Sequence, residues 1–363
     1  ALMEERHFGS VLLQAGLRAE RVNVTTDNAL LPDLELHTHT EQADSDEHNH
    51  ANEQSAQITR VFSLEQDFSP VSVSVGAVWD FAEGYNLGFA LSHAERAPSA
   101  AELFSFGPHI GTRLYEVGAL FAIDHINGGE GNKESKFGLS EEAIALETSN
   151  NIDISFRKHQ GDVGIIINAF YNKISDFYFQ QNTGYFGEIG HDHDHGHTTG
   201  DTETETAEDE HAAELPIYLF KHKDAELLGL EAQLLWQINE QWKTEIFAYV
   251  VNAELTSGEP LPRTPPLRVG AEVAFEHGRF NAHVEWTHYA KQSDIAPLET
   301  ATDGYHLLDL HIEYQLPINT LRLNLFSKIE NITDEQAYVH TSFIKDIAPR
   351  PGRNFSVGLR GQF

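Results

Sequence analysis

The last nine residues, "FSVGLRGQF" (355–363), alternate between two kinds of side chain. The apolar and polar sets take every second position: Phe355, Val357, Leu359 and Phe363 against Ser356, Gly358, Arg360 and Gln362. A repeat of two residues is typical of a β-strand whose two faces meet different surroundings. The end of the chain therefore predicts an extended strand with one apolar face.

The same alternation recurs upstream. It is clear in "TLRLNLFSKIEN" (320–331), "LLDLHIEYQL" (307–316) and "FNAHVEW" (280–286). Followed along the whole chain, the pattern predicts about twelve strands, and several of them reach the roughly 9–11 residues that cross a bilayer at a tilt. The expected ranges are 10–24, 70–81, 85–96, 138–158, 162–179, 216–238, 241–255, 265–277, 279–291, 304–315, 319–332 and 352–363.

The links between these strands alternate in length. Tight links such as "AEGY" (82–85), "QGD" (160–162) and "HG" (277–278) are separated by long polar ones. Short turns on one side and long loops on the other are typical of outer-membrane barrels. We therefore predict an all-β fold, an antiparallel transmembrane β-barrel. Its long external loops are expected at approximately 25–69, 97–137, 180–215, 292–303 and 333–351.

Aromatic residues and composition support this prediction. Trp79, Phe81, Trp236, Trp242 and Tyr305 lie near expected strand ends, where aromatic girdles form. The formal net charge of −32 argues against a nucleic-acid partner, because phosphates would be repelled. The chain has no cysteine, so a metal ion would be bound by histidine, carboxylate or backbone oxygen.

Two tracts rich in histidine and carboxylate lie in the expected long loops. "GHDHDHGH" (190–197) contains His191, Asp192, His193, Asp194, His195 and His197, and "ELHTHTEQADSDEHNH" (35–50) contains His37, His39, His48 and His50. Neutral imidazole is a good zinc ligand, and alternate residues of an extended segment share a face. We predict that these side chains capture metal ions. The alternatives are a solvated low-complexity loop and a pH sensor.

Several ordered stretches resemble a known family: "LSHAERAPSAAELFSFGPHIGTRLYEVG", "LETSNNIDISFR", "AFYNKISDFYF", "LPRTPPLRVG" and "KIENITDEQAYVHTSFIKDIAPRPGRNFSVGLRGQF". They are similar to TonB-dependent outer-membrane receptors, from about residue 70 to the end, and most similar to the zinc-receptor (ZnuD-like) branch. The resemblance implies a 22-stranded barrel plugged by an N-terminal domain. Residues 1–363 would be the C-terminal portion of that barrel, about 12 strands, without the plug.

The resemblance also implies a function and partners. The protein would be an outer-membrane receptor of a Gram-negative bacterium for active uptake of zinc. Its partners would be a zinc ion or metal complex, the membrane lipid, and the TonB energy-transducing complex, contacted through the missing N-terminal region. No resident cofactor is expected. Glu102 and His109, in a loop that the resemblance makes substrate-facing, are candidate ligands, with His222 and Glu116 as further candidates.

Other functions stay open at this point. Haem or siderophore-bound iron is the first alternative cargo, and copper or nickel would suit the same ligands. A passive metal-binding surface protein is a different class of alternative. The sequence contains no nucleophile elbow, phosphate-binding glycine loop or two-histidine helix motif. We therefore do not expect an enzyme.

Overall fold

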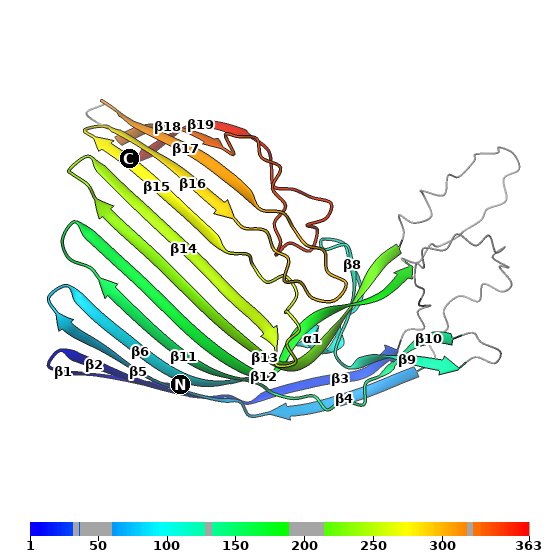
Figure 1. Cartoon of the computed structure of the whole chain (residues 1–363). Helices are drawn as coiled ribbons and strands as arrows, with labels where there is room; N and C mark the ends of the chain where they lie inside the picture. Colours follow the sequence, from blue (N-terminus) through cyan, green and yellow to red (C-terminus); the bar gives the residue numbers. More distant parts are fainter. Residues whose placement is uncertain (32–35, 37–59, 128–132, 189–213, 318–321, 363) are drawn as a thin grey trace, which may run out of the picture.

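The computed structural model describes residues 1–31, 36, 60–127, 133–188, 214–317 and 322–362. These residues form β-strands and one short helix (Figure 1). The strands are β1 (Leu2–Phe8), β2 (Val11–Ala19), β3 (Val22–Leu31), β4 (Arg60–Phe68), β5 (Val71–Ala82), β6 (Tyr85–Arg96), β7 (Phe106–His109), β8 (Leu114–Val117), β9 (Phe121–Asn127), β10 (Lys133–Leu139), β11 (Glu147–Lys158), β12 (Val163–Glu188), β13 (Glu214–Gln237), β14 (Trp242–Leu255), β15 (Arg268–His277), β16 (Phe280–Tyr289), β17 (Tyr305–Leu316), β18 (Arg322–Glu330) and β19 (Asn354–Gln362). The helix is α1 (Ala100–Phe104).

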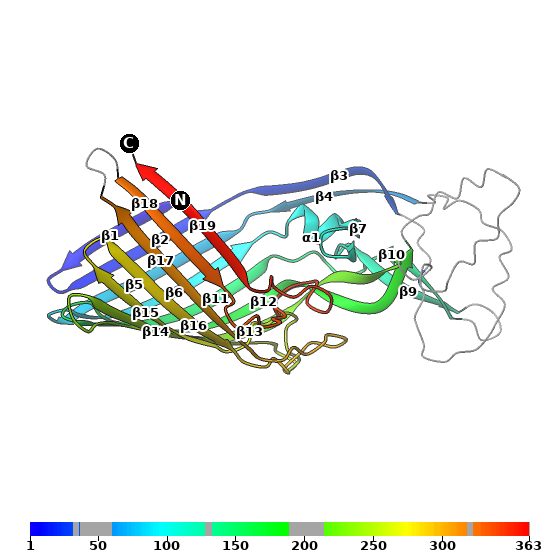
Figure 2. The same cartoon turned by 90° about the horizontal axis from the view of Figure 1, so that it is seen from above.

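One large curved sheet dominates the structure (Figures 1 and 2). It has 15 strands, and its main path runs β1-β2-β5-β6-β11-β12-β13-β14-β15-β16-β17-β18-β19. Neighbours along this path pair in antiparallel fashion, as the tight turns predict. Within the described residues β1 and β19 form the two edges of the sheet.

The expected strands are confirmed, with differences at their ends. Each predicted range overlaps a strand of the main path, and β1 precedes them. β12 continues to Glu188, beyond its predicted end at 179. In the predicted range 138–158, the strand of the main path is shorter than expected and begins only at Glu147. There the Glu147 side chain is held by Arg96, opposite it on β6. The alternation of apolar and polar residues in the sequence gives no indication of such an ion pair.

The alternation of short and long links is confirmed as well. In Figure 1 the tight turns gather at the left rim of the sheet and the long connections at the right rim. The structure differs from the expectation inside two of the long links. Residues 25–69 include most of the β3/β4 hairpin, and residues 97–137 include α1 and β7 to β10. β3 pairs with β4, β7 with β8 and β9 with β10, and β8 also pairs with β13, so these segments form strands although they lie within polar links.

Two strands extend far beyond what a bilayer requires. β12 has 26 residues and β13 has 24. At roughly 3.3 Å per residue this corresponds to about 80 Å, against the roughly 30 Å of a hydrocarbon core. Their register shifts twice, between Ile174 and Phe177 and between Asn182 and Phe186, where β-bulges bend the strand pair.

The two faces of the sheet differ in chemistry. On what we call the outer face, apolar partners stand opposite each other across strands, as in Leu91 with Ile152 and Leu230 with Val250. These four side chains are 39–46% exposed, which fits contact with lipid. The opposite, inner face carries polar and charged residues. Within the described residues no helix is long and apolar enough to cross a membrane.

Four of the five aromatic residues predicted for a girdle are exposed near one rim, and the fifth is buried. Trp79, Phe81, Trp236 and Trp242 are 41–50% exposed near the tight turns. Tyr305 is only 5% exposed, and its ring stacks on Tyr289 with centroids 4.6 Å apart. Tyr305 belongs to the inner face near the long connections, because it is the direct partner of Tyr289 across β16 and β17.

The buried clusters lie toward the long connections and not along the middle of the sheet. The largest unites β8, β9, β10 and β13 around Val117 and Ile217, both 0% exposed. α1 is joined to the start of β9 by a hydrogen bond from the Leu120 N–H to the Leu103 carbonyl, and the Leu103 side chain is also 0% exposed. Parallel pairing of β8 with β13 fixes this assembly to the extended strand. The long connections at this rim are therefore partly ordered by packing around buried side chains.

Candidate functional site

The helix α1 is held by a network of charges at the end of β6. Ser99 caps the helix by accepting a hydrogen bond from the backbone N–H of Glu102, and the Glu102 carboxylate accepts one from the Ser99 N–H. This is a capping box. Arg96 donates to Glu102 at 2.7 and 3.0 Å and to Glu147 at 2.6 Å. One arginine thus ties the helix to the start of β11.

This network keeps the Glu102 carboxylate ionised and engages both of its oxygens in hydrogen bonds. Burial alone would raise the pKa of Glu102, but the hydrogen bonds from Arg96 and Ser99 outweigh burial and lower the pKa. A lowered pKa suits a metal ligand, yet both carboxylate oxygens already accept hydrogen bonds from Arg96. The geometry accounts for Glu102 as a structural residue, and its role as a metal ligand stays a prediction.

His109 lies at the end of β7 on an exposed turn. Its Nδ1 is 2.9 Å from Thr112 Oγ1, and its carbonyl accepts hydrogen bonds from the N–H groups of Thr112 and Arg113. Arg113 has φ 55°, the left-handed conformation that closes the turn. The hydroxyl of Thr112 engages Nδ1, so Nε2 is the nitrogen with which His109 would bind a ligand.

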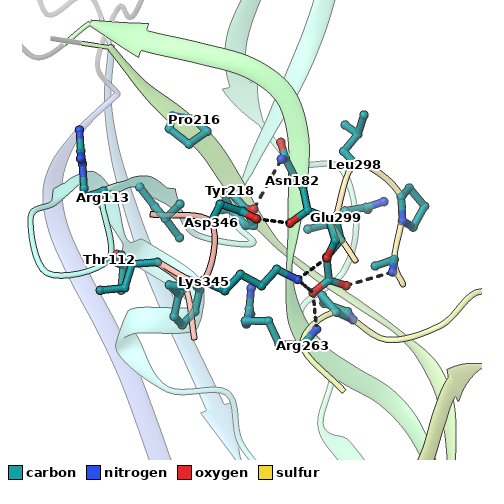
Figure 3. A pocket seen from close by; sticks show the side chains of 18 of the residues that line it. Thr112, Arg113, Asn182, Pro216, Tyr218, Arg263, Leu298, Glu299, Lys345 and Asp346 are labelled. Atoms are coloured by element: carbon teal, nitrogen blue, oxygen red, sulfur yellow. Dashed lines mark hydrogen bonds and ion pairs between the residues drawn. The ribbon is translucent and has the colours of Figure 1, made fainter. Parts of the chain in front are cut away.

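A pocket of about 360 Å³ opens among the long connections (Figure 3). Six segments of the chain meet there: the turn before β8, the extensions of β12 and β13, the 256–267 and 290–304 links, and the link before β19. Its walls combine apolar and charged side chains. The labelled residues are Thr112, Arg113, Asn182, Pro216, Tyr218, Arg263, Leu298, Glu299, Lys345 and Asp346.

A buried ion pair joins two of these links. Lys345 Nζ lies 2.9 Å from Glu299 Oε1, and the two side chains are 6% and 9% exposed. The same carboxylate accepts hydrogen bonds from the N–H groups of Arg263 and Ala296. His340 Nε2 is 3.3 Å from Glu299 Oε1 without good hydrogen-bond geometry, while its Nδ1 is 3.0 Å from Thr302 Oγ1.

These contacts determine the protonation of Glu299. Burial alone would raise the pKa of its carboxyl, but His340, Lys345 and the two backbone amides outweigh burial and lower the pKa to about 2. Glu299 is therefore an anion at every physiological pH. Its charge is neutralised inside the wall of the pocket, so it organises the loops and leaves other groups to meet a ligand.

Arg263 faces the pocket, as Arg113 does, and within the described residues neither has a carboxylate at ion-pair distance. The Arg263 guanidinium stacks over the ring of Phe343 at 3.9 Å. Burial lowers the pKa of Arg263, partly offset by attraction to Tyr218 and Glu299. Arginine on an aromatic ring is held in place while its N–H groups stay free to donate. The pocket can therefore receive an anionic or hydrogen-bond-accepting group.

His222 lies on the outward extension of β13. Its Nδ1 is 2.9 Å from Asp176 Oδ1, and its Nε2 is 3.8 Å from Glu142 Oε2. The ring is 5.1 Å from that of Tyr178. Asp176 has φ 54° at the first bulge of β12, which turns its side chain toward His222. Glu116 lies on β8, between β7 and β13.

The structure describes only some of the residues that the sequence analysis proposed as metal ligands. The residues His37, His39, His48, His50, His191, Asp192, His193, Asp194, His195 and His197 lie outside the described residues. Across the described ranges no group of three or more His, Asp or Glu side chains is arranged to hold a metal ion. Sequence reasoning missed Glu299, Lys345 and Arg263. The signal was a charged residue inside an otherwise apolar loop, as in "SFIKDIAP" (342–349).

Comparison with known proteins identifies the architecture. The family model "TonB dependent receptor-like, beta-barrel" matches residues 2–332. "Copper transporter OprC" is similar with TM-score 0.66 and 18% identity, covering 97% of this chain and 45% of that chain.

Two iron receptors are similar in the same way. The FrpB iron transporter from Neisseria meningitidis gives TM-score 0.57 at 13% identity, covering 98% of this chain and 44% of that chain. The Ferric-Catecholate import receptor Fiu from K12 E. coli gives TM-score 0.55 at 12% identity, covering 97% and 42%. At these identities the likeness is one of fold, and the chain spans less than half the length of each structure.

Proposed function

The chain belongs to the TonB dependent receptor-like, beta-barrel family, and from this premise we propose that the whole protein imports a metal ion across the outer membrane and that the ion is zinc. The family supports a receptor. The choice of zinc rests on the ligands, because imidazole with carboxylate suits a borderline divalent ion and no thiolate is present.

The observation that supports the proposal is the position of the strand ends to which the two tracts are joined in the sequence. The tract at 37–50 is joined to the ends of β3 and β4, at Leu31 and Arg60. The tract at 190–197 is joined to the ends of β12 and β13, at Glu188 and Glu214. All four attachment points lie at the rim of long connections (Figure 1). That is the rim where the pocket opens, so both tracts are attached on the side from which cargo would arrive.

Among the two loop candidates, the geometry favours His109 over Glu102 as a ligand. His109 is exposed and would offer Nε2 without breaking an existing contact. Glu102 would first have to leave Arg96, at the cost of a charge-assisted hydrogen-bond pair. In this proposal the tracts collect zinc, His109 contributes to a more ordered site, and the TonB complex and the outer-membrane lipid are partners of the whole protein.

Uptake of radioactive zinc by cells that express the full-length gene tests the proposal. We expect accumulation at limiting zinc that a protonophore abolishes, because active import needs the proton-motive force. Deletion of residues 190–198 should reduce the initial rate severalfold. The matched control deletes residues 201–209, "DTETETAED", which removes acidic charge from the same link and no histidine.

Two results would overturn the proposal. Uptake equal to that of cells with an empty vector would exclude zinc as cargo. Uptake that is unaffected by the protonophore would indicate a passive metal-binding surface protein. Equal losses from the two deletions would show that net charge, and not imidazole, attracts the ion.

A metal complex is the second candidate cargo, and one observation favours it. The pocket in Figure 3 combines apolar walls with the guanidinium of Arg263 stacked on Phe343. Such a surface suits the organic part of a haem or siderophore complex better than a bare ion. Competition distinguishes the two cargoes: excess haem or ferric siderophore should leave zinc uptake unchanged if zinc is the cargo.

A further inference from the structure

Strands β16 and β17 carry a ladder of metal-binding residue types on the inner face. We call each pair of directly opposed residues on these strands a rung. Successive inner rungs are Glu285 with Asp309, His283 with His311, and Asn281 with Glu313. The intervening residues, including Val284, Trp286 and Tyr314, are apolar and 40–41% exposed on the outer face. The imidazole rung is therefore flanked on both sides by carboxylates of the same face.

The two imidazoles of the middle rung are close enough to share one ion. Their ring centroids are 4.8 Å apart and the planes are inclined by 29°. Two nitrogens bound to one zinc ion at about 2.0–2.1 Å are roughly 3.4 Å apart in tetrahedral geometry. A ring nitrogen lies on the rim of its ring, so rotation of the rings about their side-chain bonds brings two nitrogens to this separation without moving the backbone.

Further ligands are available within one rung. Glu313 follows His311 by two residues on the same face and accepts a hydrogen bond from Asn324 Nδ2 through Oε1. Glu285 accepts one from Thr287 Oγ1, also through Oε1. In both carboxylates the other oxygen is not used by these bonds. Two cations lie nearby: Arg268 Nη2 is 4.0 Å from Glu285 Oε1, and Lys328, opposite His311, has its ammonium 3.0 Å from Glu330.

The imidazole rung lies between two pockets of the inner face. Toward the long connections, a pocket of about 440 Å³ is lined by Arg268, Tyr289 and Tyr305. Toward the tight turns, a pocket of about 380 Å³ is lined by Asn281 and Glu313, the next rung of the ladder. An ion that passes along this face from one pocket to the other meets His283 and His311 on the way.

We propose that His283 and His311 form a binding site for a divalent transition-metal ion on the inner face of the sheet, completed by water or, after rotation of its side chain, by Glu285 or Glu313. The proposal rests on the proposed function, because the inner face becomes the path of the cargo only if the whole protein imports metal. Two neutral imidazoles with oxygen ligands suit zinc, copper or nickel rather than calcium or magnesium.

The same two strands provide a matched control. His288 and His306 are also directly opposed, with centroids 4.4 Å apart, but lie on the outer face beside Trp286. This second pair has the same spacing and lies away from the inner face. A substitution there removes an equivalent pair of rings and leaves the proposed site intact.

Anomalous diffraction from zinc-soaked crystals of the full-length receptor locates the ion directly. We expect an anomalous peak at the zinc edge about 2.1 Å from one nitrogen of each ring. In His283→Asn the peak should fall at least about tenfold, because one remaining imidazole cannot chelate. In His288→Asn it should be unchanged.

Two results would overturn the proposal: no peak at this rung in crystals whose other sites contain zinc, or a peak that persists in His283→Asn. Each crystal also reports whether its variant is folded. Failure of the proposed function is a separate result, since cells would then take up no zinc although the peak is present at the rung.

Discussion

Replacement of Lys345 by Met removes the cation that neutralises Glu299 inside the wall of the loop pocket. Methionine keeps the length of the side chain, so the change is mainly one of charge. Glu299 has a pKa of about 2 against an ordinary 4.5. At about 1.36 kcal/mol per pKa unit, the surroundings stabilise the carboxylate by roughly 3 kcal/mol. His340, Lys345 and two backbone amides share this effect. Loss of one partner by a buried polar or charged group costs about 1–3 kcal/mol, so we expect a loss of about 2 kcal/mol in Lys345→Met.

Amide hydrogen exchange followed by mass spectrometry measures this loss locally. The N–H groups of Arg263 and Ala296 donate to Glu299, so their exchange reports whether the carboxylate stays in place. A loss of about 2 kcal/mol in opening free energy predicts roughly 30-fold faster exchange. Adding Glu299→Gln to Lys345→Met should restore part of the protection, because the uncompensated buried charge is then removed.

Exchange in the wild type should depend on pH in one direction. The folded state lowers the pKa of Glu299, so its contribution to stability is complete above the ordinary pKa of 4.5 and is lost as the pH falls toward about 2. The control is Lys291→Met, because Lys291 pairs with Asp303 at the surface, with side chains 62% and 92% exposed. If Lys345→Met exchanged no faster than Lys291→Met, the conclusion that the Lys345–Glu299 ion pair holds the 290–304 link against the link before β19 would be wrong.

Three further changes test other parts of the structure. Gly118→Ala should destabilise the 97–127 segment by about 1–3 kcal/mol, because a Cβ would lie 2.2 Å from the carbonyl oxygen of Leu103; limited proteolysis would show earlier cleavage there. Leu230→Arg should lower the free energy of unfolding in lipid by about 2–4 kcal/mol, measured by denaturant titration in liposomes, because it puts a charge on the outer face. Arg96→Met should speed amide exchange in α1 by about tenfold, because the carboxylate of Glu102 loses its cation.

The strands were predictable because two constraints act on the same residues. Lipid requires every second side chain to be apolar, and the closed hydrogen-bond ladder requires length without interruption. The residues around Leu230 and Val250 satisfy both, and their register follows from the short turns. The β3/β4 hairpin was not predicted because it leaves the main sheet and pairs only with itself. There lipid imposes no pattern, so the sequence alternates only weakly.

The loop pocket was not predictable for a different reason. Lys345 and Glu299 are 46 residues apart, and they meet only because β17, β18 and β19 bring the two links to one rim. Nothing in "FIKDI" or "PLETA" indicates that one stretch needs the other. Glu102 and Ser99 show the opposite case. Their spacing of three residues is a local signal for a helix cap, and the structure forms the cap.

The inner face of the sheet is where the sequence is least constrained by the fold. The barrel requires inner side chains to be compatible with water, and serine or asparagine would satisfy this as well as histidine does. On β16 and β17 the outer positions are explained by lipid, whereas the inner rung of His283 and His311 is not explained by stability. The two imidazoles stack on each other, and His311 also stacks on Phe326, but smaller polar residues would be equally compatible with a wet inner face. Where the fold does not require a particular residue type, the residue that is present can indicate what the receptor binds. For this reason the inner residues of β16 and β17 carry more functional information than the apolar alternation on the lipid side.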